Sequence, residues 1–191
     1  MQIRLLRLLH ARLLSRLTRA VVLLCLALST PWALATDLSR AQQQWSAGQR
    51  AQAVSTLEAA LRQTPNDLTL RFALGVMRMD LGDLAAAQAI FLSLTQDFPD
   101  LPDPFNNLAV IHAAQGELEL ARSALEQALR LQPEHAQAQE NLGDLYLRLA
   151  VRAYQRAEQV QLAPSASLAA KISRTQALMP SSANVNANAK P

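Results

Sequence analysis

Small and bulky apolar residues recur along the chain at a fixed interval and predict an array of paired helices. The bulky residues Leu57, Phe91 and Leu125 are equally spaced in the sequence. A small residue stands four positions before each of them, in the series Ala53, Ala87 and Ala121. Small side chains let two helices approach closely, and bulky ones fill the space between them. We therefore expect each pair to lie at a buried helix–helix contact.

Two further residue types keep the same interval and mark the helix ends. They form the series Gly48, Gly82 and Gly116 and the series Pro65, Pro99 and Pro133. Glycine accepts the left-handed backbone that ends a helix, so the glycines should end the first helix of each pair. Proline cannot continue a helix, so the prolines should end the second. Asp83 and Glu117 follow two of the glycines and place negative charge at the start of the next helix.

The turn signal is missing after Tyr146, where no glycine–acid pair separates two helices. We therefore expect one fused helix, about 40 Å long at 1.5 Å per residue. Pro164 breaks it, and a serine at 165 or 167 should cap a short final helix. The predicted helices span residues 38–47, 49–63, 67–81, 83–96, 103–115, 117–131, 135–161 and 166–178.

The 34-residue period resembles the tetratricopeptide repeat, a helix–turn–helix unit. The first helix of that repeat carries a bulky residue, then Leu-Gly, then Tyr. The corresponding stretches here are residues 71–78, 105–112 and 139–146. The last of these matches best, at Leu142, Gly143 and Tyr146. The resemblance covers about residues 37–162 and implies an all-α fold, a right-handed solenoid of helical hairpins with about 3.5 repeats and a C-terminal capping helix.

The resemblance and the composition together give an expected domain organisation. The first repeat departs from the pattern, as terminal repeats often do. The last residues are polar and without periodicity, which predicts a disordered tail. The expected segments are a signal peptide (1–35), a degenerate first repeat (36–65), a second repeat (66–99), a third repeat (100–133), a modified fourth repeat with the fused helix (134–162), a capping helix (163–179) and the tail (180–191).

The N-terminal segment has the order of a secretory signal. Residues 1–19 are basic, Ala20–Leu28 is an apolar run, and Ala33-Leu34-Ala35 offers a cleavage site. We expect cleavage after Ala35 and a periplasmic or secreted protein. Two alternatives remain open: an Arg-rich mitochondrial presequence, and an uncleaved membrane anchor at residues 5–28.

The positive charge of the chain belongs to that segment. The net charge is +3, but five arginines precede position 20. Without residues 1–35 the 18 basic residues fall to 13 against 15 acidic ones, which gives −2. The basic balance is therefore no argument for nucleic-acid binding. The same cleavage removes Cys25, the single cysteine.

Candidate chemistry is sparse in the remaining chain. Its two histidines, His112 and His135, stand far apart in the sequence, with no cysteine or acid at ligand spacing. We expect His112 to be a half-buried packing residue and His135 to be solvated. No glycine-rich phosphate loop and no nucleophile motif is present. We therefore expect no catalytic residues, no metal, no cofactor and no enzymatic activity.

The resemblance directs attention to the concave groove that the first helices of such repeats line. Asn107 and Asn141 each precede the signature leucine and stand one repeat apart. In peptide-binding members of the family an asparagine at this place bonds the backbone of an extended peptide, since an amide both donates and accepts. The alternative is that both face water, as asparagine is common at this place. The other expected groove residues are Phe72, Val76, Asn106, Val110, Glu140, Asp144 and Arg148.

The groove residues also indicate a ligand class. Phe72 and Val76 either expose apolar surface for a ligand or pack against the preceding helix. The family's clamp for a C-terminal carboxylate needs several Lys or Arg, and only Arg148 qualifies. We therefore expect a peptide with an apolar anchor and some positive charge.

These expectations combine into one function with two alternatives. The leading hypothesis is a non-enzymatic scaffold in the bacterial cell envelope, with a protein or peptide partner. One alternative is a membrane-tethered assembly factor that keeps its N-terminal anchor. The other is a structural homo-oligomer that packs through residues 134–161 and the final helix.

Overall fold

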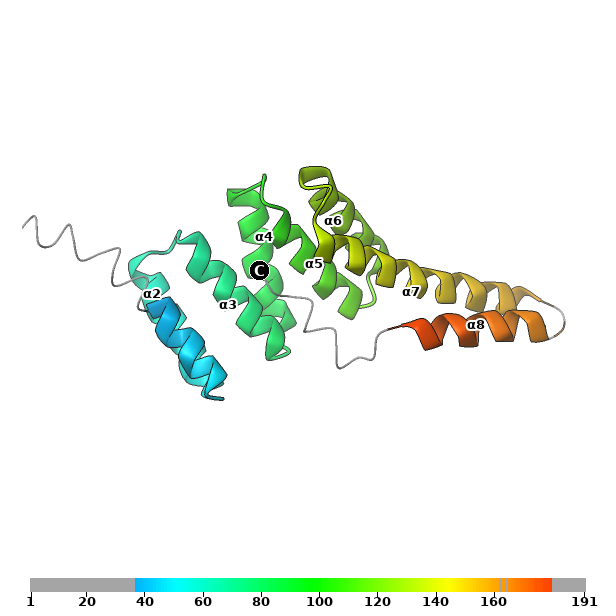
Figure 1. The fold of residues 1–191 in the computed structure, drawn as a ribbon, viewed down its shortest axis with the longest axis horizontal. Coiled ribbons are helices and arrows are strands. Elements are labelled where there is room, and N and C mark those ends of the chain that lie inside the picture. Colours follow the sequence, from blue (N-terminus) through cyan, green and yellow to red (C-terminus); the bar gives the residue numbers. More distant parts are fainter. Residues whose placement is uncertain (1–36, 162, 164, 180–191) are drawn as a thin grey trace, which may run out of the picture. The chain divides into compact units, whose positions relative to one another are not determined.

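The computed structural model describes residues 37–161, 163 and 165–179, and these residues form helices without strands (Figure 1). The expected signal peptide, anchor and C-terminal tail therefore lie outside the described residues. After a helix at residues 37–46 come α2 (Arg50–Gln63), α3 (Leu68–Asp80), α4 (Leu84–Asp97), α5 (Pro102–Ala114), α6 (Leu118–Leu131), α7 (Ala136–Val160) and α8 (Ala166–Leu178). The expected all-α class is confirmed, and the predicted helix bounds hold to within two residues. The chain divides into two compact units, Met1–Gln63 and Thr64–Pro191.

The described part of the first unit is the helical pair formed by residues 37–46 and α2. Gly48 stands between the two helices with a φ of 78°, which is the left-handed backbone expected there. Ala53 and Leu57 of α2 are fully buried. The Thr56 hydroxyl donates a 2.8 Å hydrogen bond to the Gln44 side-chain oxygen and so ties the pair together.

The second unit repeats the same turn after α3 and after α5. Gly82 and Gly116 have φ values of 78° and 80°. Across the first of these turns, the Asp83 amide donates to the Arg78 carbonyl at 2.9 Å, which is the six-to-one bond of a Schellman motif. The Asp83 carboxylate then accepts from the Ala86 amide at 3.3 Å and caps α4.

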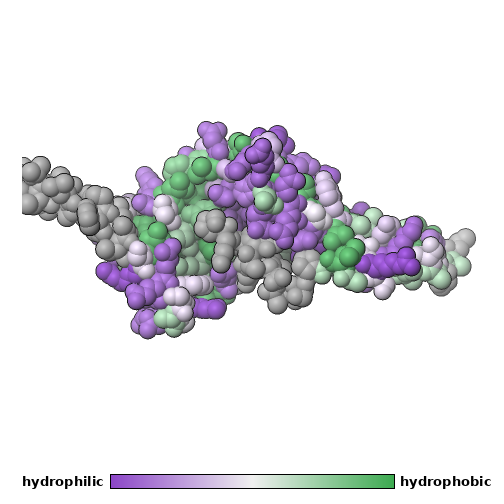
Figure 2. Space-filling model, in the orientation of Figure 1, coloured by the Kyte–Doolittle hydropathy of each residue, from purple (hydrophilic) through white to green (hydrophobic). Residues whose placement is uncertain are grey.

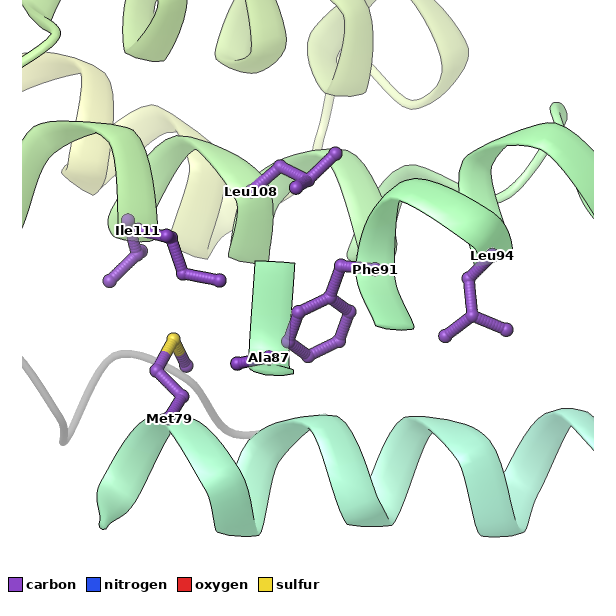
Figure 3. Packing of buried hydrophobic residues seen from close by; sticks show 7 residues of the cluster. Met79, Ala87, Phe91, Leu94, Leu108 and Ile111 are labelled. Atoms are coloured by element: carbon purple, nitrogen blue, oxygen red, sulfur yellow. The ribbon is translucent and has the colours of Figure 1, made fainter. Parts of the chain in front are cut away.

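The buried core of the second unit lies between successive helices: α3 packs on α4, α4 on α5, α5 on α6 and α6 on α7 (Figure 1). Figure 3 shows Phe91 and Ala87 of α4 beside Met79 of α3 and Ile111 of α5. Phe91, Ala87 and Ile111 are fully buried. The repeating pairs of small and bulky residues therefore mark the core, as the sequence predicted.

The fourth repeat is replaced by the long helix α7, 25 residues without an interruption. This confirms the predicted fused helix. Ser165 caps α8 by accepting a 3.2 Å hydrogen bond from the Leu168 amide. The helix α8 then packs on α7 (Figure 1). Val151 of α7 and Leu168 of α8 are both buried.

Candidate functional site

The candidate site is the surface that α3, α5 and α7 present, called here the first-helix surface. These are the first helices of successive repeats, and α5 contacts both α3 and α7. The residues predicted to bind a partner all lie on these helices, at Phe72, Val76, Asn106, Asn107, Val110, Glu140, Asn141, Asp144 and Arg148.

The α3 end of this surface is apolar. Phe72 and Val76 are half-buried and pack against the core cluster around Phe91. The Phe72 ring meets the Phe91 ring edge to face, with 5.5 Å between centroids and 75° between planes. Such aromatic pairs hold a ring in one orientation. Phe72 therefore offers a fixed, partly exposed apolar edge, and Val76 adds a second half-buried apolar side chain on the same helix. Val110 on α5 is buried, at 8% exposed.

The middle of the surface is a pair of amides from successive first helices. The Asn141 amide nitrogen donates a 2.8 Å hydrogen bond to the Asn106 side-chain oxygen. Asn106 is 2% exposed, whereas Asn141 is half-buried. The bond joins α5 to α7 and fixes the orientation of the Asn141 amide at the surface.

Asn107 lies in a different environment from Asn141, although the two stand at the same repeat position. It is 1% exposed, and its amide nitrogen donates to the Asp103 carbonyl on its own helix at 2.9 Å. Its side-chain oxygen accepts no hydrogen bond from the residues that the structure describes. The neighbour Asn106, rather than Asn107, makes the contact with Asn141.

The α7 end of the surface is acidic. Glu140 is exposed and Asp144 is half-buried. Arg148, one turn after Asp144, donates a 3.2 Å hydrogen bond to the Ala113 carbonyl near the end of α5. Its guanidinium therefore already stabilises a helix C-terminus, where positive charge is favourable.

His135 corrects an expectation, because its side chain is not solvated but only 11% exposed. Its Nδ1 accepts from the Ala138 amide at 3.1 Å and caps α7. Its Nε2 lies 2.9 Å from an Asp103 oxygen on α5. Since Nδ1 accepts, this hydrogen-bond geometry assigns the ring proton to Nε2, which donates to Asp103.

His112 is half-buried, as expected, and its Nδ1 lies 2.6 Å from a Glu117 oxygen across the α5–α6 turn. In the described ranges, no three His, Cys, Asp or Glu side chains come together as a metal site would require. None of the described helices combines the length and apolarity needed to cross a membrane.

Comparisons with known proteins agree with this architecture. Models of the tetratricopeptide repeat match residues 44–108 and residues 106–170. No protein of curated function matches the chain's sequence.

Solved structures share the fold at low sequence identity. The first tetratricopeptide repeat of Spaghetti (RPAP3), bound to an HSP90 peptide, superposes with a TM-score of 0.56 at 16% identity over 60% of this chain and 91% of that one. A thermophilic repeat protein of Thermus thermophilus gives 0.55 at 20% identity over 80% and 86%. MamA of Desulfovibrio magneticus gives 0.54 at 15% identity over 74% and 73%. Both repeat models together span residues 44–170, and the chain belongs to the tetratricopeptide-repeat family.

Proposed function

We propose that this chain is a non-enzymatic scaffold that holds an extended peptide segment of a partner protein along the first-helix surface. Tetratricopeptide-repeat domains are protein-interaction modules, and one structural neighbour was solved with a peptide bound. The observation that carries the proposal is the order of groups along this surface: apolar edges at Phe72 and Val76, the Asn106–Asn141 amide pair, then the acids of α7.

The amide pair supplies the contact to a peptide backbone. Asn106 is buried and accepts from the Asn141 nitrogen, so Asn141 is held in one orientation at the surface. Asn141 is half-buried at this surface. Its amide group both donates and accepts, so we expect it to contact the backbone of a peptide laid along the surface.

The two ends of the surface set the ligand's chemistry. A large apolar side chain fits the edge at Phe72 and Val76, and a Lys or Arg fits the acids Glu140 and Asp144. The HSP90 peptide of the structural neighbour, SRMEEVD, carries the opposite charge. A peptide carboxylate would need a basic side chain to bind. Among the predicted partner-binding residues that side chain is Arg148, which already donates to the Ala113 carbonyl. We therefore expect this chain to prefer a basic peptide.

The test uses two labelled ten-residue peptides, each with a leucine near one end and either two lysines or two glutamates near the other. Fluorescence anisotropy should show at least tenfold tighter binding of the lysine peptide. Glu140→Lys with Asp144→Lys should remove that preference, and Asn141→Ala should weaken binding about fivefold, the equivalent of one hydrogen bond. Asn107→Ala with Asn141→Ala should weaken it no further than Asn141→Ala alone, because Asn107 is buried.

A matched control places the same charge change on α6, at Glu119→Lys with Glu126→Lys, where both side chains are solvent-exposed and lie off the first-helix surface. This variant should bind both peptides as the unaltered chain does. Equal affinity of the unaltered chain for the lysine and glutamate peptides would contradict the proposed ligand class.

We further propose that the scaffold acts in the bacterial cell envelope after export. The support is the order of basic, apolar and small residues in positions 1–35. The mass of the protein isolated from its native cells tests this. A mature chain starting at Thr36 supports cleavage, whereas an intact N-terminus in the membrane fraction supports the tethered alternative. Sedimentation at high concentration tests the homo-oligomer alternative.

A further inference from the structure

Two glycines at the same repeat position have opposite surroundings. Gly75 of α3 and Gly143 of α7 both follow the signature leucine and stand two repeats apart. A methyl group added at Gly75 would lie 2.8 Å from the tip of the Phe91 ring and 3.2 Å from an Ile90 methyl. The same addition at Gly143 meets no atom within 4 Å among the residues that the structure describes. At α3 the glycine lets the second helix approach, whereas none of the described helices packs against Gly143.

The cause is the fused helix. After α3 and α5, a glycine turn folds the next helix back over the signature residues. The helix α7 has no such turn, and α8 begins at Ala166 and covers the second half of α7, around Val151. Tyr146 therefore stays 51% exposed, whereas His112, its counterpart in α5, is half-buried.

The uncovered side of α7, called here the open α7 face, is long and uncharged. Its members recur every three or four residues and so share one side of the helix: Gln139, Gly143, Tyr146, Ala150, Ala153 and Ala157. All are exposed or half-buried. Over this length the helix rises about 27 Å, at 1.5 Å per residue. The face is therefore long enough for a partner helix to lie along it.

Basic residues border this face. The Lys171 ammonium group of α8 lies 5.8 Å from the centroid of the Tyr154 ring, next to the open α7 face. Arg174 lies one turn further along α8, and Arg156 flanks the face on α7. Arg156 and Arg174 form no ion pair with any residue that the structure describes. Figure 2 shows hydrophobic and strongly hydrophilic surface side by side over the α7–α8 hairpin.

The charge of the hairpin contrasts with that of the repeats before it. Residues 145–179 contain five basic residues and one acidic residue, whereas residues 64–144 contain four basic and 12 acidic residues. A second copy that docked through the same face would bring two basic borders together, which electrostatic repulsion disfavours. The charge therefore favours an acidic partner over self-association.

We propose that the open α7 face binds an acidic amphipathic helix of a partner protein, in the place that the second helix takes in the other repeats. A bulky apolar side chain of that helix lies over Gly143, as Phe91 lies over Gly75. Acidic residues on its flanks face Lys171, Arg174 and Arg156. This surface is separate from the first-helix surface and takes a helix rather than an extended peptide.

A peptide based on α4 serves as the probe, because α4 already packs on Gly75. A labelled peptide of residues 83–98 is made with glutamate at the positions of Ala85, Ala89 and Gln96, which are exposed in α4. A matched peptide carries lysine at the same three positions. Anisotropy with the full chain should show the glutamate peptide binding at least tenfold more tightly than the lysine peptide.

Variants of the chain then locate the contact. Gly143→Leu should weaken binding of the glutamate peptide at least tenfold, because the added side chain blocks close approach. Lys171→Glu with Arg174→Glu should weaken it to a similar extent. The control Arg62→Glu with Arg130→Glu makes the same charge change at exposed positions on α2 and α6 and should leave binding unchanged. Circular dichroism and thermal melting should show that all these variants remain folded, since the positions are exposed.

Three results would overturn the proposal: equal binding of the two peptides, full binding by Gly143→Leu, or chain dimers in sedimentation that Gly143→Leu dissolves. The last would make a second copy the occupant. Asn141→Ala should not alter binding of the helical peptide, so failure of this proposal and failure of the first-helix surface are distinguishable.

Discussion

The helices α3 and α7 carry the same Leu-Gly pair in the same repeat register, yet only α3 has a second helix folded over it. Leu74 and Gly75 are buried under α4, whereas Gly143 is exposed. The difference lies in the turn: α3 is followed by Gly82 and Asp83, and α7 runs on without either. The signature residues thus specify a surface for close packing, and the turn residues decide whether the chain itself covers it.

The largest expected difference between the two helices comes from removing an aromatic ring. Phe91→Ala removes a fully buried side chain that packs on Gly75, so we expect it to lower the free energy of unfolding by about 3–5 kcal/mol. Tyr146→Ala removes a ring that is 51% exposed on α7, and it should cost less than about 1 kcal/mol. Urea unfolding of both variants measures the difference. Similar losses would mean that the α7 ring is covered in solution.

A second contrast comes from adding volume. Ala87→Leu inserts a large side chain at a fully buried contact of α4 and should cost about 1–3 kcal/mol. Ala153→Leu places the same side chain on the exposed side of α7 and should change stability by no more than about 0.5 kcal/mol. Thermal melting compares the two. An unchanged melting temperature for Ala87→Leu would show that the repeat register is wrong.

The His135 side chain caps the N-terminus of α7 and also bonds Asp103 of α5. His135→Ala removes both the cap on Ala138 and the hydrogen bond to Asp103, so we expect a loss of about 1–2 kcal/mol. His135→Asn keeps a capping acceptor and should recover part of that loss. Hydrogen exchange should show the loss concentrated in the first turns of α7. Uniform loosening of α3 and α4 instead would contradict a local role.

The smallest expected changes in the free energy of unfolding should have opposite signs at the two glycines. Gly75→Ala puts a methyl group 2.8 Å from a fully buried ring, so it should destabilise the chain by about 1 kcal/mol despite the better helix propensity of alanine. Gly143→Ala meets open space and should stabilise it by about 0.5–1 kcal/mol. Denaturant midpoints decide this. A loss of stability at both positions would mean that Gly143 is packed.

The sequence alone predicted the helices, the left-handed glycines and the fused α7, because each depends on residues close together in the chain. The contacts across the first-helix surface were harder to predict. Asn106 and Asn107 are adjacent but point about 100° apart around the helix, so only the packing of α5 on α7 selects the one that meets Asn141. His135 was expected in solvent because its partner, Asp103, lies far back in the sequence, at the start of α5.

The open α7 face was not foreseen for a similar reason. The final helix was predicted as a capping helix, without a predicted position along α7. The position at which a short helix packs depends on the loop before it and on which apolar stripe of the neighbouring helix is uncovered. Neither can be recognised from the nearby sequence. The helix α8 packs on the second half of α7 rather than the first (Figure 1), and no described side chain covers Gly143.

The unbroken α7 also has a mechanical consequence. Two helices joined by a glycine turn can hinge at that turn, whereas a continuous helix moves as a rigid strut. A force applied to α8 or to the far end of α7 is therefore carried directly to the Arg148–Ala113 and Asn141–Asn106 contacts on α5. A displacement of the far end of α7 would therefore act on the contacts between α7 and the third repeat, rather than being absorbed at a turn.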